Sequence, residues 1–140
     1  MLTGPRFTTE VEIAVPFHDV DMMGVVWHGN YFRYFEIARA ALLNPFNYGY
    51  RQMKASGYVW PVVDTRVKYR DAVTFEQRIR VRAHIEKYEN RLRIAYQIFD
   101  AQTGKRTTTG YTIQVAVDEA SREMCFVSPA ILFERMGIAP

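Results

Sequence analysis

The first regular pattern in the chain is a strict alternation of apolar and polar residues over positions 10–17. Alternation of this kind is typical of a strand that buries one face. Pro16 lies near its end, where a missing N–H is tolerated. An irregular stretch, residues 18–29, follows. The apolar positions of the alternation are Val11, Ile13, Val15 and Phe17.

The second pattern is helical. Apolar residues recur at helical spacing from Tyr31 to Leu42, and further apolar residues occupy the other faces. A helix that is apolar nearly all round is a buried helix. We expect Gly29 or Asn30 to cap its start. Pro45 should end it, because the residue before a proline disfavours helical backbone.

The rest of the chain is predicted to be mostly strand. Expected strands cover residues 58–70, 75–86, 92–98 and 109–117, with a short helix or ordered loop over 50–55 and a C-terminal helix through 136. Tight connections between long strands predict a largely antiparallel sheet. The predicted fold class is α+β, with a five-stranded sheet wrapped around one long buried helix. Because one sheet covers a helix on one side only, the remaining apolar surface predicts a dimer.

Composition narrows the class of protein. A chain of 140 residues, 49% apolar and 24% charged, suits one globular domain over residues 1–140. A net charge of +3 is too weak to indicate a nucleic-acid partner. The single cysteine, Cys125, cannot form an internal disulfide and favours a reducing cytoplasm. No apolar signal segment and no run of roughly 18 to 20 apolar residues is present, so no membrane span is expected.

The densest group of reactive side chains lies between the first strand and the long helix, in residues 18–31. A helix N-terminus offers unpaired N–H groups that can hold a carbonyl oxygen as it gains negative charge. A nearby aspartate can supply the base or nucleophile. Aspartates in such loops are also common turn residues, and spacing alone favours that structural interpretation for Asp21 and, more strongly, for Asp19. His28 is likewise typical of a packed or capping side chain.

The segment from Phe17 to Arg39 resembles the signature of the 4-hydroxybenzoyl-CoA thioesterase and YbgC-like branch of the hotdog superfamily. The pattern is D-x-D-x-x-G-V-V, an aromatic residue and H, then x-N-Y-F, with E-x-A-R further along the helix. The matching residues are Asp19, Asp21, Gly24, Val25, Val26, Trp27, His28, Asn30, Tyr31, Phe32, Glu36, Ala38 and Arg39. The resemblance in element order covers nearly the whole chain. It implies a hotdog fold and hydrolysis of an acyl-CoA ester to the free acid and CoA.

The resemblance also implies roles for single residues. Asp21 takes the place of the family's catalytic carboxylate, and the backbone N–H of His28 takes that of the donor to the thioester carbonyl. Basic residues near the turn at positions 89–90 would hold the CoA phosphates. The expected substrate-binding residues are Gly24, Val25, Trp27, Gly29, Tyr31, Glu36, Lys87 and Arg91. Met22 and Met23 depart from the small residues usual after the catalytic aspartate, and two bulky thioethers would reshape the acyl pocket.

Several alternatives stay open at this point. Glu36 is favoured as the partner of a structural salt bridge with Arg33 or Arg39, although some hotdog enzymes use a helix carboxylate of the facing subunit in catalysis. Asp21 can act as general base or as nucleophile. The acyl carrier can be CoA or an acyl carrier protein. His28 and Glu36 would suit a hotdog dehydratase, and a non-catalytic thioester-binding protein is the third candidate.

Association and cofactors complete these expectations. Self-association as a dimer is predicted, with a tetramer favoured, because long-edged hotdog dimers often pair further. No metal ligand spacing and no phosphate-binding glycine loop is present. The sequence therefore implies no cofactor beyond the coenzyme A that forms part of the substrate.

Overall fold

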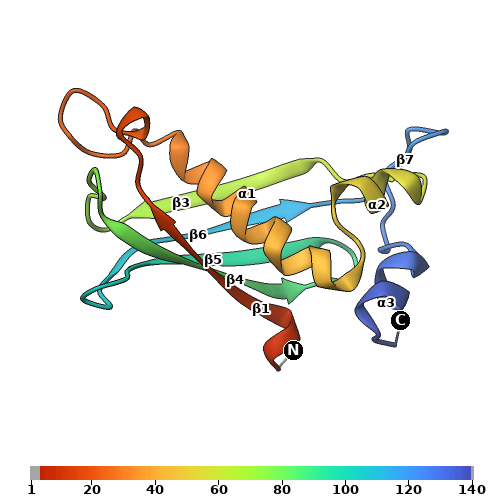
Figure 1. Cartoon of the computed structure of the whole chain (residues 1–140). Coiled ribbons are helices and arrows are strands. Elements are labelled where there is room, and N and C mark those ends of the chain that lie inside the picture. The colour runs from red at the N-terminus through yellow and green to blue at the C-terminus, as the bar shows by residue number, and fades with distance from the viewer. Residues whose placement is uncertain (1–3, 140) are drawn as a thin grey trace.

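The computed structural model describes residues 4–139, in which a five-stranded antiparallel sheet lies along one long helix (Figure 1). The predicted α+β class is confirmed. Residues 1–3 and 140, which belong to the predicted domain, lie outside the described part. The sheet has the order β1-β4-β5-β6-β3. Its strands are β1 (Thr8–Ala14), β3 (Val62–Tyr69), β4 (Arg78–Lys87), β5 (Leu92–Asp100) and β6 (Arg106–Gln114).

The remaining elements are the helices, the 3-10 turns and two short strands. Two of them, β2 and β7, pair with each other as a separate antiparallel ribbon. The helices are α1 (Asn30–Leu43), α2 (Tyr50–Ala55) and α3 (Ala130–Met136); the 3-10 turns are η1 (Pro5–Phe7), η2 (Phe17–Asp19) and η3 (Asn44–Phe46); the ribbon is β2 (Tyr58–Val59) with β7 (Val117–Asp118).

The core lies between α1 and the sheet. Alternate residues of β4 and β5 point toward the helix and are fully buried, as the period of two predicts. The Phe35 ring of α1 stacks on Tyr96 of β5, with ring centroids 4.3 Å apart. Gly110 of β6 makes this close approach possible, because a Cβ there would lie 2.9 Å from the Phe35 ring. The absence of a side chain at one strand position thus lets the helix settle onto the sheet.

The position of β3 is where the structure differs most from the expected strand over residues 58–70. Pro61 interrupts that run, since it has no N–H to continue a ladder, and the two parts pair with different strands. The second part, β3, crosses to the edge of the sheet beside β6. The expected strand over 109–117 is similarly divided into β6 and β7. The apolar run was therefore correct as strand but not as one strand.

One side of α1 stays open in the single chain. Phe32 and Ile37 are exposed on the helix, and Val62 and Val63 are exposed on β3. The helix is consequently buried on the sheet side but not nearly all round.

We expect Gly110→Ala to lower the free energy of unfolding by about 1–3 kcal/mol, the usual cost of forcing atoms into a packed core. The new methyl would lie 2.6 Å from the Arg66 carbonyl oxygen as well as against Phe35. Urea denaturation measures the change. Thr109→Ala, on the opposite face of the same strand, is the control and should cost about 0.5 kcal/mol or less. Equal losses in the two variants would show that helix approach does not depend on the glycine.

Candidate active site

The candidate site is a short hairpin between η2 and α1. Val20 pairs with Val26, and the Asp21 N–H donates to the Val25 carbonyl at 2.9 Å. Gly24, with φ near 79°, closes the turn and donates to the Asp21 carbonyl at 3.0 Å. This backbone conformation favours glycine. The expected irregular stretch is thus an ordered hairpin that carries Asp21 at one end of its turn and returns the chain to the start of α1.

Asp21 is exposed, and its carboxylate is only partly used. One oxygen, Oδ1, accepts the Met23 N–H at 2.8 Å, which is an Asx-turn. No other described residue donates to Oδ2. The structural interpretation of Asp21 therefore accounts for one oxygen and leaves the second free to meet a substrate or a water.

Asp19 differs from Asp21 in every respect. Its side chain is 2% exposed, accepts the Tyr34 hydroxyl at 2.6 Å, and forms an ion pair with Arg33. Its backbone carbonyl accepts the Trp27 N–H at 3.0 Å and the Asn30 side-chain amide at 2.9 Å. A carboxylate that is buried and satisfied in this way has no free oxygen to offer a substrate.

The start of α1 provides unpaired donors. No side chain caps this helix, and within residues 4–139 neither the His28 N–H nor the Gly29 N–H donates a hydrogen bond. The positive end of the helix dipole lies at the same place. The His28 carbonyl points the other way and accepts the Tyr69 hydroxyl at 3.1 Å. Tyr69, which spacing along the chain gave no reason to select, fixes the helix start to β3.

Trp27 covers this helix start. Its ring lies over Gly29, where a Cβ would be 2.2 Å from an indole carbon, and against the His28 ring at 4.9 Å between centroids. Both His28 and Trp27 are exposed. The expected binding residues Gly24, Val25, Trp27 and Gly29 are thus brought together around Asp21. Tyr31 is buried beneath them, with its ring 4.8 Å from that of Tyr69.

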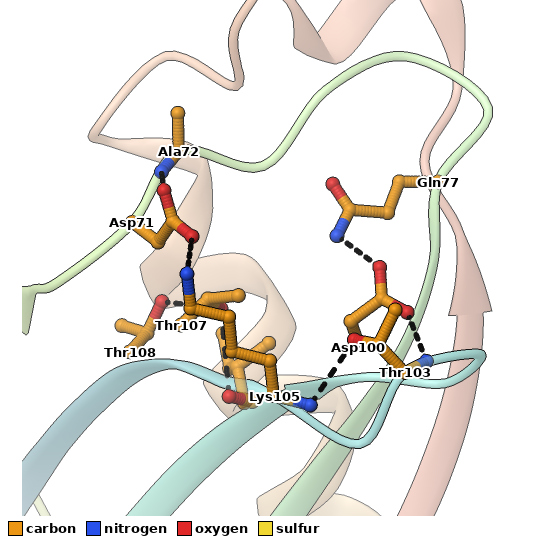
Figure 2. A network of polar contacts seen from close by, with 9 residues as sticks. Asp71, Ala72, Gln77, Asp100, Thr103, Lys105, Thr107 and Thr108 are labelled. Carbon is orange, nitrogen blue, oxygen red and sulfur yellow. Dashed lines mark hydrogen bonds and ion pairs between the residues drawn. The ribbon is translucent and has the colours of Figure 1, made fainter.

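The loop between β3 and β4 supports the hairpin from behind. The Val26 N–H donates to the Val73 carbonyl at 2.7 Å, and Val25 forms an antiparallel bridge with Thr74. Gln77 holds this loop to the β5–β6 turn: it accepts the Thr74 N–H at 3.0 Å and donates to Asp100 at 2.6 Å. Figure 2 shows this second contact, and beside it the ion pair between Asp71 and Lys105.

Both of these contacts lower the pKa of an aspartate. The ammonium group of Lys105 lowers the pKa of Asp71 and is itself raised in pKa by the same contact. The Thr103 N–H and the Gln77 amide lower the pKa of Asp100. These contacts join residues that are distant in sequence and carry no recognisable motif, so only the folded chain reveals them.

A hollow lies about two turns beyond the start of α1. A cavity of about 700 Å³ is lined by residues of α1, α2 and the β2–β3 segment, among them Glu36, Arg39 and Trp60. Glu36 is 68% exposed and pairs with Arg39 at 3.2 Å, which agrees with the favoured structural interpretation of this residue. Glu36 lies seven positions after Gly29, about 10 Å along the helix from its start.

Lys87 and Arg91 lie even further away. Ala14, at the end of β1 next to the hairpin, pairs with Arg78 at the start of β4, whereas Lys87 ends that strand. Nine residues of strand correspond to about 30 Å. Within one chain the two proposed phosphate-binding residues and Asp21 thus stand at opposite ends of the sheet.

A family model places this architecture among known proteins. The model described as the thioesterase-like superfamily matches residues 15–133. The chain belongs to this superfamily. The predicted resemblance and the predicted class of enzyme, a thioester hydrolase, are confirmed at this level. The match includes the hairpin, α1 and all of the sheet except β1.

Individual members of the thioesterase-like superfamily resemble the chain over most of its length. It is 29% identical over 111 residues to the "Putative acyl-CoA thioesterase YneP" of Bacillus subtilis, which covers 79% of this chain and 80% of that protein. A structure of a DHNA-CoA thioesterase from Staphylococcus aureus has 30% identity and a TM-score of 0.77, covering 85% of this chain and 80% of that one. Slr0204 of Synechocystis, a 1,4-dihydroxy-2-naphthoyl-CoA thioesterase, has a TM-score of 0.83 at 18% identity, with coverage of 93% and 96%.

Among the described residues, no helix is long and apolar enough to cross a bilayer.

The Asp100 contact gives the stability a defined response to acid. Because the pKa of Asp100 is lowered on folding, its stabilising effect is present above its unfolded value of about 3.9 and is lost as pH falls through the folded value. We expect Asp100→Asn to lower the melting temperature at pH 7 by more than at pH 3. Thermal unfolding across this range measures it. Glu134→Gln on α3 is the control, and an Asp100→Asn deficit that is constant with pH would contradict the assignment.

Proposed function

We propose that the chain is an acyl-CoA thioesterase that forms one hotdog domain over residues 1–140 and works in the cytoplasm. One observation carries this proposal. An exposed carboxylate with an unpartnered oxygen, that of Asp21, is held on the same small hairpin that leads to the unpaired N–H groups of His28 and Gly29. A base or nucleophile beside an oxyanion site is the arrangement that acyl transfer requires.

The proposed chemistry follows from these two groups. The thioester carbonyl oxygen accepts hydrogen bonds from the His28 and Gly29 N–H groups, which stabilise it as it becomes negative. In one route water attacks the carbonyl carbon and gives a proton to Asp21. The carbon–sulfur bond then breaks, and the thiolate recovers that proton to leave as free CoA. In the other route the Asp21 carboxylate attacks the carbonyl carbon and the carbon–sulfur bond breaks to expel the CoA thiolate. Water then hydrolyses the mixed anhydride to the free acid, and the proton released goes to the thiolate.

A second copy of the chain is expected to complete the site. The edge strand β3 has a free ladder of N–H and C=O groups, and exposed apolar residues lie on it and on the adjacent face of α1. A two-fold partner joined at β3 would cover this face. The partner would also bring its own Glu36 cavity, Lys87 and Arg91 toward the Asp21 site. Within one chain these residues lie away from that site. Further pairing to a tetramer stays a prediction.

The names of the structural neighbours indicate which acyl groups to assay first. Two structurally similar proteins are named for an aryl ester, 1,4-dihydroxy-2-naphthoyl-CoA. Aryl-CoA esters therefore stand first in a substrate panel, with short- and long-chain acyl-CoAs and acyl carrier protein esters beside them.

We expect thiol release from at least one ester in this panel, and a loss of about 100-fold or more in kcat for Asp21→Asn. Asp118→Asn is a matched control, because Asp118 also forms an Asx-turn, with the N–H groups of Ala120 and Ser121, but lies at β7. It should keep full activity. Water loss from a hydroxyacyl ester without thiol release would instead indicate a dehydratase, and binding without turnover a non-catalytic protein. Equal activity of the two variants would return Asp21 to a turn residue.

We also expect Val63→Glu to weaken self-association, because it places two carboxylates in one interface, and to raise the dimer dissociation constant by roughly ten-fold or more. Sedimentation velocity over a concentration series measures this. Val127→Glu, at an exposed valine of the C-terminal segment, is the control and should leave the assembly unchanged. An unchanged dimer in both variants would exclude β3 as its interface.

A further inference from the structure

The two aspartates of the D-x-D pattern are two residues apart but have opposite environments. Asp21 is exposed with a free oxygen, whereas Asp19 is buried and fully engaged. Burying a carboxylate costs free energy unless its oxygens are satisfied, so a chain that buries Asp19 gains something from its contacts. Which groups these contacts join indicates what is gained.

The contacts of Asp19 join the two ends of the hairpin to the helix. Its carbonyl accepts the N–H of Trp27, the residue directly before His28, and the side-chain amide of Asn30, the first residue of α1. Its carboxylate accepts the Tyr34 hydroxyl and pairs with Arg33, one turn further along the same helix. One residue thus holds both the strand that leads to Asp21 and the helix start that provides the unpaired N–H groups.

We propose that Asp19, together with Tyr34, is a positioning residue that fixes the Asp21 carboxylate relative to the N–H groups of His28 and Gly29. It does not touch the substrate. The catalytic value of this positioning rests on the proposed function, whereas the contacts that Asp19 makes are a property of the fold. A displacement of about 1 Å between reacting groups can cost roughly 100-fold in rate, so a fixed distance between them has direct catalytic value.

Tyr34 suits this role because, within residues 4–139, its hydroxyl bonds Asp19 and no other group. The side chain is 0% exposed, its ring packs against that of Tyr31, and the Arg33 guanidinium lies 5.4 Å over its face. Burial, followed by the hydrogen bond to Asp19, raises the pKa of Tyr34. The hydroxyl therefore stays protonated and donates to Asp19 throughout the pH range in which an enzyme of this kind would act.

The test compares two buried tyrosines. Tyr34→Phe removes the hydroxyl that holds Asp19, while Tyr96→Phe removes a hydroxyl that is equally buried but bonds Thr112, at 2.9 Å, within the sheet. Both variants lose one buried hydrogen bond, and Tyr34→Phe should lose more stability because its bond is to a carboxylate, so kcat is compared at a temperature where both variants are folded. Only Tyr34→Phe should lower kcat, by about ten-fold or more, with KM for the ester changed less than roughly two-fold.

Two further measurements separate positioning from general damage. In an Asp21→Asn background, Tyr34→Phe should have no further effect on kcat, because the group it positions has been removed. Amide hydrogen exchange of residues 20–28 should become faster in Tyr34→Phe and stay unchanged in Tyr96→Phe. Asp19→Asn, which keeps the volume but weakens the Arg33 contact, should show the same pattern as Tyr34→Phe.

The outcomes distinguish the two proposals. If the unaltered protein hydrolyses no thioester, the proposed function fails, and hydrogen exchange alone decides whether Asp19 and Tyr34 hold the hairpin in place. If the protein is active but Tyr34→Phe and Tyr96→Phe have the same kcat and the same protection of residues 20–28, the positioning role is overturned. Selective loss of kcat with selective opening of the hairpin supports it.

Discussion

The packing of α1 against the sheet is the contact on which the rest of the molecule depends. Phe35 can stack on Tyr96 only because the neighbouring strand has no side chain at Gly110. This approach sets the height of the helix above the sheet and therefore the place where its first turn begins. The hairpin returns to that first turn, and the β3–β4 loop that supports the hairpin leaves the same sheet. The geometry of the site therefore depends on this one contact between the helix and the sheet.

Much of the fold follows from periodicity alone. Alternation with a period of two located the long strands, and helical spacing located α1, because one buried face on each is what holds them together. The order of the strands did not follow. The place of β3 at the edge depends on its pairing with β6, whose partner residues lie 39 to 52 positions away in sequence. No local pattern in the chain records that pairing, although Pro61 marks the boundary at which the run divides.

The site was predictable to a different extent. The resemblance of the D-x-D pattern to a known signature indicates Asp21 and the helix start at His28, whereas spacing alone favours a turn role for Asp21 and, more strongly, for Asp19. Their difference comes from Arg33 and Tyr34, which turn toward Asp19 only when α1 has formed and docked. Glu36, Lys87 and Arg91 show the opposite case. The resemblance selected them by position along the chain, and within one chain Lys87 and Arg91 lie at the opposite end of the sheet from the hairpin, while Glu36 pairs with Arg39 on α1.

The side chains of Met22 and Met23 stand at the tip of the hairpin, almost wholly exposed, and the Met23 backbone N–H is the group that bonds Asp21. The hairpin is closed below them, by the Val20–Val26 pair and by the Asp19 and Trp27 backbone groups. The two demands on this segment are consequently separated: its base keeps the reacting groups at a constant spacing, while its tip is free to change in size and polarity. Under the proposed function, the side chains at the tip can therefore change residue by residue while the spacing of Asp21 from the helix start is kept.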